Sequence, residues 1–137
     1  MEFKTSFDFD FKAKSANNSN ASESTVYISH IAYNDTCIAC AGNGFVKLYN
    51  IDNGKVDTYF GTGQKALSDL QFANKRPNLL CTSSSVNGVI AIYDTRCNNK
   101  ANSKNKSKKV CLIRSPNKQN NALYSVAMDD NTIVGCI

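Results

Sequence analysis

Two cysteines at a C-x-x-C spacing are the first residues of this sequence that could do chemistry. Cys37 and Cys40 have the spacing that zinc sites and thiol redox centres use. In a β-strand, however, residues three positions apart point to opposite faces, and no second C-x-x-C follows. We therefore expect two buried cysteines that act as small apolar side chains, with a metal or redox site as the alternative.

Nucleophilic catalysis would have to use His30, which is the only histidine of the chain. His30 lies in a segment with strand character, where a packed or edge histidine is expected. Ser83, Ser84 and Ser85 end another such segment, and no nucleophile-elbow pattern surrounds them. The sequence therefore predicts that the protein is not an enzyme and has no catalytic residues, no metal, no cofactor and no small-molecule substrate.

A basic stretch, RCNNKANSKNKSKK, occupies residues 96–109. Eight Lys or Arg residues and no acid lie between Asp94 and Asp129, and the formal net charge of the chain is +5. Such lysines could contact phosphates and bind RNA in a salt-dependent way. The candidate nucleic-acid-binding residues are Lys100, Lys104, Lys106, Lys108 and Lys109. Because the stretch lacks aromatics for base stacking, a solvated loop is the first interpretation, and contact with RNA or an acidic partner is the second.

Short apolar segments rather than helical patterns fill the chain. Residues 3–13 alternate Phe with polar residues, which predicts a half-buried strand, and residues 14–25 are polar, like a linker. Four strand-length segments follow, at residues 26–34, 36–42, 45–50 and 56–61. Asn43-Gly44 between the second and third segments tolerates a tight hairpin turn, which predicts antiparallel neighbours.

The same pattern then starts again. Strand-like segments recur at residues 67–74, 79–85, 89–96 and 109–115, and a third series begins at 122–129 and 132–137. NGFVKLYN at residues 43–50 returns as NGVIAIYD at residues 87–94. The first strands align in three columns: Ile28, Leu67 and Leu123; Ile31, Leu70 and Val126; Tyr33, Phe72 and Met128. Four short strands every ~40–45 residues predict the blades of a β-propeller.

The residues that carry these blades resemble the WD-repeat family over residues 26–137. In that family the turn and third strand have the sequence Asp-Gly-x-Ile-x-Leu-Trp-Asp. Both octapeptides, at residues 43–50 and 87–94, match its glycine, its apolar alternation and its aromatic position. Tyr49 and Tyr93 replace the tryptophan, and Asn43 and Asn87 replace the turn aspartate. The family's Gly-His appears only as Gly-Thr-Gly at residues 61–63. The hydrogen-bond network of Trp, hydroxyl, His and Asp that such blades can form is therefore expected to be incomplete.

The expected fold is all-β, with about two and a half four-stranded antiparallel blades plus an N-terminal strand, in an incomplete ring. The expected units are an N-terminal strand at 1–13, a linker at 14–25, blade 1 at 26–61, blade 2 at 62–115 with a basic insertion at 97–109, and a partial blade 3 at 116–137. By the resemblance, the N-terminal strand would latch a last blade that is missing. Because a ring needs ~4–8 blades, a fragment or a truncated gene model is expected.

The resemblance implies a non-catalytic scaffold that binds other proteins around the central channel. The corresponding connections contain Gln64, Lys65, Asn87, Lys118 and Gln119. The RNA-associated protein described above, of a ribosome-assembly type, is one alternative.

A second alternative is a substrate receptor of a cullin-type ubiquitin ligase. Tyr93-Asp94-Thr95-Arg96 resembles the Trp-Asp-x-Arg docking box of such receptors, in which Asp94 and Arg96 would be the contacts. An ordinary turn after the third strand explains the same residues, because Asp and Arg are common there.

The expected compartment is intracellular, cytoplasmic or nuclear. The chain has no apolar run that would span a bilayer, and acids interrupt the N-terminal segment where a secretory signal would be apolar. The six cysteines are accordingly expected to be reduced thiols rather than a disulfide framework. No membrane partner is predicted.

Overall fold

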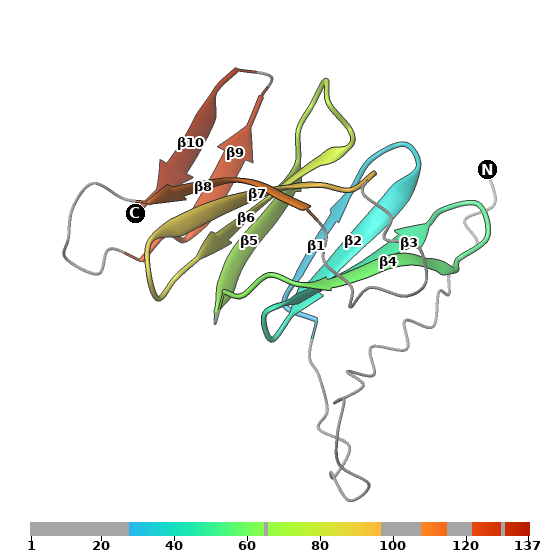
Figure 1. The fold of residues 1–137 in the computed structure, drawn as a ribbon, viewed down its shortest axis with the longest axis horizontal. Helices are drawn as coiled ribbons and strands as arrows, with labels where there is room; N and C mark the ends of the chain where they lie inside the picture. The colour runs from blue at the N-terminus through green and yellow to red at the C-terminus, as the bar shows by residue number, and fades with distance from the viewer. Residues whose placement is uncertain (1–27, 65, 97–107, 115–121, 130) are drawn as a thin grey trace, which may run out of the picture.

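A computed structural model of the chain describes residues 28–64, 66–96, 108–114, 122–129 and 131–137 (Figure 1). Within these residues every regular element is a β-strand, and the strands form three separate antiparallel sheets. The predicted segments at 1–13 and 14–25 lie outside the described residues. The search for a helix long and apolar enough to cross a membrane found none in the described part of the chain.

The first sheet, blade 1, is a four-stranded meander. Its strands are β1 (His30–Tyr33), β2 (Cys37–Gly42), β3 (Phe45–Asn50) and β4 (Val56–Gly61), paired in chain order. Asn43 and Gly44 have φ angles of 49° and 79°, so the predicted two-residue turn between β2 and β3 is confirmed. Asn50 closes the next turn, because its side-chain oxygen accepts from the backbone N–H groups of Asp52 and Asn53.

The second sheet, blade 2, repeats this order. Its strands are β5 (Leu67–Phe72), β6 (Leu79–Ser84), β7 (Val89–Asp94) and β8 (Lys108–Arg114). The repeated octapeptide forms the third strand in both blades, but the turns before it differ. In blade 2 the connection between β6 and β7 has four residues, 85–88, and only Gly88 has a positive φ there, of 57°.

The third sheet, blade 3, consists of β9 (Ser125–Met128) and β10 (Ile133–Cys136), again antiparallel. Two complete meanders and the first half of a third therefore follow one another along the chain. The predicted fold class, a partial set of propeller blades, is confirmed.

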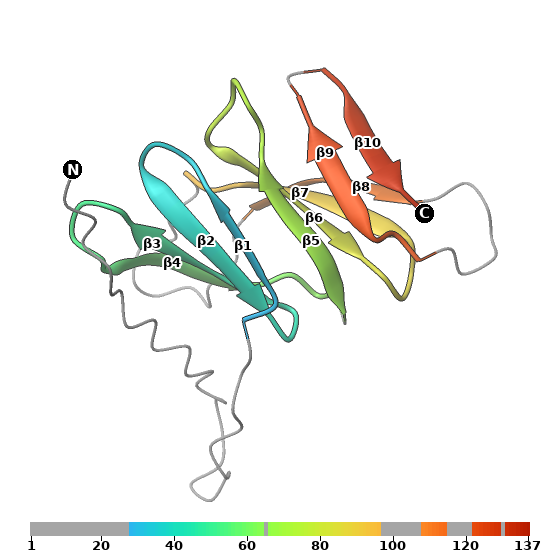
Figure 2. The ribbon, with the colours of Figure 1, turned by 180° about the vertical axis from the view of Figure 1, so that it is seen from behind.

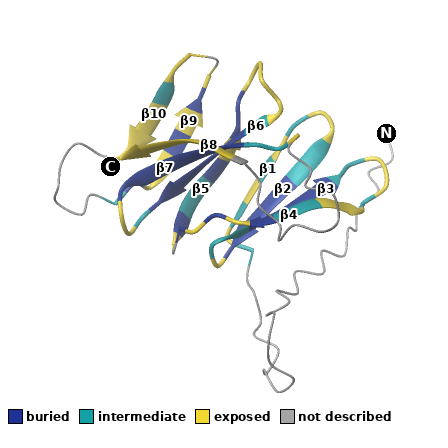
Figure 3. Ribbon diagram, viewed as in Figure 1, coloured by how far each residue is buried: buried dark blue, intermediate teal, exposed yellow. Residues whose placement is uncertain are grey.

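The sheets stack face to face. β1 contacts β5 and β5 contacts β9, so the first strands of the three blades follow one another across the array (Figure 2). Most residues of β2, β3, β6 and β7 are buried, whereas β8 and β10 are largely exposed (Figure 3). Burial of apolar side chains between sheets provides the main stabilisation of such a stack.

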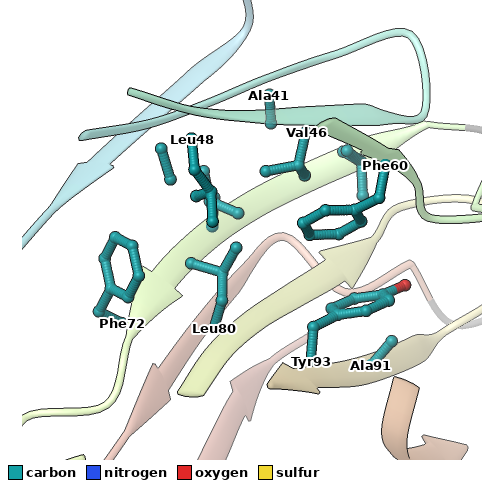
Figure 4. Close-up of a cluster of buried hydrophobic side chains, with 11 residues drawn as sticks. Ala41, Val46, Leu48, Phe60, Phe72, Leu80, Ala91 and Tyr93 are labelled. Atoms are coloured by element: carbon teal, nitrogen blue, oxygen red, sulfur yellow. The ribbon is translucent and has the colours of Figure 1, made fainter. Parts of the chain in front are cut away.

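The larger core lies between blades 1 and 2 (Figure 4). Blade 1 contributes small and medium side chains and one aromatic, namely Ala39, Ala41, Val46, Leu48 and Phe60. Blade 2 contributes Leu67, Leu70, Phe72, Leu80, Ala91 and Tyr93. The rings of Phe60 and Tyr93 pack at a tilt of 39°, with centroids 4.9 Å apart. A second cluster, with Ile90, Ile92, Leu123, Val126 and Met128, joins blade 2 to blade 3.

Two of the three aligned columns of first-strand residues are buried in blade 2 but exposed in blade 1. Leu70 and Phe72 are 4% and 6% exposed, because blade 1 covers them. Their counterparts in β1, Ile31 and Tyr33, are 60% and 79% exposed. On this face of blade 1 the side chains of β1 are therefore exposed, whereas Cys40 and Tyr49 of β2 and β3 are 0% and 5% exposed.

Candidate protein-interaction surface

The strands β1, β5 and β9 line an open groove, which we call the inner groove. Its volume is about 660 Å³, and its lining includes Tyr33, Asp69, Gln71, Asn74 and Ala127. Gln71 and Asn74 are exposed, and both also line a smaller depression that continues between β5, β9 and β10. Within the described ranges, each of the three strands pairs with one neighbouring strand only, so each has a second backbone edge that no described strand pairs with. Exposed amides beside open edges can bind an extended peptide.

Asp69 fixes the wall of the inner groove between blades 2 and 3. One carboxylate oxygen accepts from the Ser125 hydroxyl at 2.8 Å and from the backbone N–H of Val126 at 2.9 Å. The other oxygen accepts from the backbone N–H of Leu70 at 2.8 Å. Ser68 adds a second link, because its hydroxyl donates to the backbone oxygen of Leu123. Charge-assisted bonds of this kind hold β9 at a fixed position beside β5.

A buried polar network holds the connection between blades 1 and 2 against blade 2, and Thr62 of this connection donates to the backbone oxygen of Gly44 in blade 1. The Gln64 side chain is 4% exposed; its Nε2 donates to the backbone oxygen of Val89 at 3.0 Å, and its Oε1 accepts from the Thr82 hydroxyl at 2.5 Å. The Tyr93 hydroxyl donates to the backbone oxygen of Thr62 at 3.0 Å. Burial raises the pKa of Tyr93 to about 12, although the Thr82 hydroxyl acts in the opposite direction.

Blade 2 contains part of the expected network, and the predicted incompleteness stays a prediction. A glutamine provides the donor and the acceptor that we expected from a histidine, and Thr82 provides the strand hydroxyl. Gly63-Gln64 ends two residues before β5, in the connection where the resemblance places a Gly-His. In blade 1 the position of Thr82 is occupied by Cys40, a residue with little hydrogen-bonding capacity.

The five residues predicted around the channel have different environments. Gln64 is buried in the network, so its side chain presents no surface to a partner in this structure. Asn87 is exposed in the turn before β7. Lys65, Lys118 and Gln119 lie outside the described residues. Gln71 and Asn74 were not predicted, although their alternation with the buried Leu70 and Phe72 indicates a polar face of β5.

Asp94 and Arg96 lie at the opposite end of β7 from Val89, which contacts Gln64. They are therefore separated from Asn87 by the length of the strand. The Arg96 guanidinium donates to both carboxylate oxygens of Asp94, at 3.0 Å and 2.6 Å. The Asp94 oxygen also accepts from the Arg96 backbone N–H. The pair closes the turn after β7, as the ordinary-turn interpretation expects.

Most of the basic stretch lies outside the described residues, including Lys100, Lys104 and Lys106. Lys108 is described only through its backbone, which pairs with Asp94 in the sheet. The Lys109 ammonium donates to the backbone oxygen of Thr62 at 3.3 Å and lies 5.8 Å from the centre of the Tyr93 ring. Within the described part of the chain, Lys109 therefore contributes to blade packing.

Cys37 and Cys40 point to opposite faces of β2, as predicted: Cys37 packs against the core between blades 1 and 2, and Cys40 belongs to a cluster on the other face. Burial raises the pKa of Cys37, and it raises that of Cys40 to about 11, so both thiols stay protonated at neutral pH. The search for groups of three or more His, Cys, Asp or Glu that could hold a metal found none among the described residues.

The remaining candidates for nucleophilic chemistry have ordinary hydrogen bonds. His30 is half-buried, and its Nδ1 lies 2.9 Å from the Ser29 hydroxyl oxygen. Ser83 is buried and shares a hydrogen bond with the Ser68 hydroxyl at 2.9 Å. Ser84 is also buried, and its hydroxyl oxygen accepts from the backbone N–H of Val86. These contacts orient strand ends and turns.

Stacked four-stranded meanders with their first strands around one groove define the class of fold: these are blades of a β-propeller. No known family model matches the sequence, and no curated protein matches it. Among solved structures, the crystal structure of Hsv2 from Kluyvelomyces marxianus, a β-propeller protein, is similar over 82% of this chain with a TM-score of 0.54 and 13% sequence identity. The chain spans 31% of the length of that protein. The likeness shows the fold.

Proposed function

We propose that the chain is a non-catalytic scaffold of the WD-repeat type, which binds an extended segment of another protein in the inner groove. The observation that carries this proposal is the exposed amide pair of Gln71 and Asn74 beside the open edges of β5 and β9. Both amides offer donors and acceptors, and Tyr33 and Phe72 add apolar surface in the same groove.

The WD-repeat assignment is supported by the polar network of blade 2. Gln64, Thr82 and Tyr93 occupy the positions before the first strand, in the second strand and in the third strand from which WD repeats build their network. We also propose a similarity to WD repeat-containing protein 89, on the resemblance of the segments VKLYN, LQFAN and YDTR. Asp69 and Ser68 hold the groove wall between β5 and β9, and a preorganised groove loses less entropy when it binds a flexible segment.

Proximity labelling in cells tests the proposal with matched variants. Gln71→Arg combined with Asn74→Arg changes the inner groove, whereas Asn53→Arg changes an exposed asparagine in the turn between β3 and β4. We expect the unmodified chain and the Asn53→Arg chain to label the same partner proteins. The chain with both Gln71→Arg and Asn74→Arg should no longer label some of these partners. The same set of labelled proteins for all three chains would refute binding in the groove.

Two further roles follow from the sequence, and the same cells test them. If the protein binds RNA, the RNA that it retains should fall with added salt and fall further when residues 97–109 are deleted. If it is a substrate receptor of a cullin-type ligase, Arg96→Ala should remove a ligase adaptor from the labelled proteins. Retained RNA with no salt dependence and no change on deletion would eliminate the first role.

A further inference from the structure

One face of blade 1 points away from blade 2, and we call it the Lys47 face. The register of β2 and β3 places Cys40 opposite Lys47 and Ile38 opposite Tyr49 on this face. The other face of the same strands forms the core with blade 2, and blade 3 packs on blade 2 in turn. The other two described sheets therefore do not cover the Lys47 face.

The Lys47 face is nevertheless buried at its centre. Cys40, Lys47 and Tyr49 are 0%, 7% and 5% exposed. A sheet buries the side chains of a face only when another element lies against that face. The cover of the Lys47 face must therefore come from the part of the chain outside the described ranges.

Lys47 decides which chemistry this cover needs. The same position of the repeated octapeptide is Ala91 in blade 2, which is buried against blade 1. Burying an ammonium costs far more than burying a methyl group unless a carboxylate accompanies it. The Tyr59 ring, whose centre is 5.7 Å from the ammonium, adds a weaker attraction. The cover must therefore bring a carboxylate as well as apolar surface.

Two sources of that carboxylate can be set aside. Asp35, Asp52 and Asp57 of blade 1 are exposed, so they do not accompany a buried ammonium. Residues 97–107 and 115–121 contain no acid and no aromatic residue, and their lysines would repel the ammonium. The N-terminal part of the chain, in contrast, contains both acids and phenylalanines.

We propose that residues 7–11, Phe-Asp-Phe-Asp-Phe, dock on the Lys47 face within the same chain. The phenylalanines cover the apolar part of the face, and Asp8 or Asp10 accepts from the Lys47 ammonium. Phe and Asp point to opposite sides of an extended segment, so the carboxylates lie at the margin of the contact, where the long lysine stem brings its ammonium. The contact requires no further blade.

The path of the chain allows this contact. Ile28, where the described residues begin, packs against the cluster of Cys40 and Tyr49, so the preceding segment reaches blade 1 on the Lys47 face. Residues 12–27 connect this point to the proposed docking segment and can span up to ~50 Å when extended. Four strands are only about 15 Å wide, so the segment can return over the sheet.

Thiol labelling of the full 137-residue chain with N-ethylmaleimide tests the proposal, with mass spectrometry giving the rate at each cysteine. Cys40 lies on the Lys47 face, whereas Cys81 belongs to the core between blades 2 and 3 and shows whether the blades are intact. Lys47→Glu opposes the carboxylates and should accelerate the labelling of Cys40 at least ~tenfold, with Cys81 unchanged. Lys55→Glu makes the same charge change in an exposed turn and should leave both rates unchanged.

Charge reversal assigns the contact to residues 7–11. Asp8→Lys combined with Asp10→Lys should accelerate the labelling of Cys40 in the same way, and adding both to Lys47→Glu should restore slow labelling. Unchanged labelling in the chain with the two aspartate substitutions would overturn the proposal even where Lys47→Glu unfolds the blade, because these substitutions change no residue of the blade. A triple variant in which Cys81 stays protected but Cys40 does not would also overturn it. Protection of Cys40 that rises with protein concentration would assign the cover to a second copy and overturn it as well.

Discussion

Gln64→Ala is the sharpest test of the buried network that holds the connection between the first two blades against blade 2. The substitution removes the donor to the backbone oxygen of Val89 and the acceptor for the Thr82 hydroxyl, and both groups lie in the interior. A buried polar group that loses its partner costs about 1–3 kcal/mol. With two such groups, we expect the free energy of unfolding to fall by about 3 kcal/mol, a large part of the stability of a small domain.

Urea denaturation followed by far-ultraviolet circular dichroism measures this loss. Gln71→Ala is the matched control, because it removes the same side chain from an exposed position of β5 and should change the stability by less than about 0.5 kcal/mol. Thr82→Val should cost less in the Gln64→Ala chain than in the unmodified one, with a coupling of at least about 0.5 kcal/mol. Equal losses for the two glutamine variants would refute the buried network.

Three further outcomes follow from the structure. Asp69→Ala should make the amide hydrogens of β9 and β10 exchange roughly tenfold faster, because the carboxylate holds blade 3. The exchange in β2 and β3 should not change, and an equal acceleration in all four strands would contradict this. Burial raises the pKa values of Cys81 and Tyr93 to about 12, so the unfolded chain releases these protons first, from pH 9.0 for Cys81 and from pH 10.0 for Tyr93. Above those values the stability should fall by up to about 1.4 kcal/mol per pH unit and group, and Cys81→Ala should reduce the slope in a urea series. Gly44→Ala should lower the urea midpoint by an equivalent of about 2 kcal/mol, because φ is +79° and the new Cβ would lie 2.6 Å from the backbone oxygen of Gln64.

The strands could be predicted because their signals are local. Alternating apolar residues mark each strand, and Asn43-Gly44 fixes the first hairpin through backbone conformations that few other dipeptides adopt. The aligned columns of Leu70 with Val126, and of Phe72 with Met128, correspond to residues that are buried between blades. A repeated sequence thus predicted repeated packing wherever a neighbouring blade is present.

The network and the groove could not be predicted, because neighbouring sheets create them. Gln64 lies in a connection that looks solvated in the sequence, and its burial depends on stacking against blade 1, where Thr62 and Gly44 are hydrogen-bonded to each other. Gln71 and Asn74 become a candidate binding surface only because β1 and β9 border the same groove. Propensity and periodicity describe one strand at a time and contain no information about such contacts.

The repeated tyrosines show how position in the array changes what one residue type does. Tyr93 packs on Phe60 of the preceding blade and reaches Thr62 with its hydroxyl, so it connects two sheets. Tyr49 occupies the same strand position in blade 1 and is 5% exposed, but it clusters with Cys40 on the face of blade 1 that points away from blade 2. The same residue type is therefore buried in both blades, but among the described sheets only Tyr93 joins one sheet to another. The position of a tyrosine in the repeat thus predicts its burial, and the neighbouring blade decides what its ring contacts.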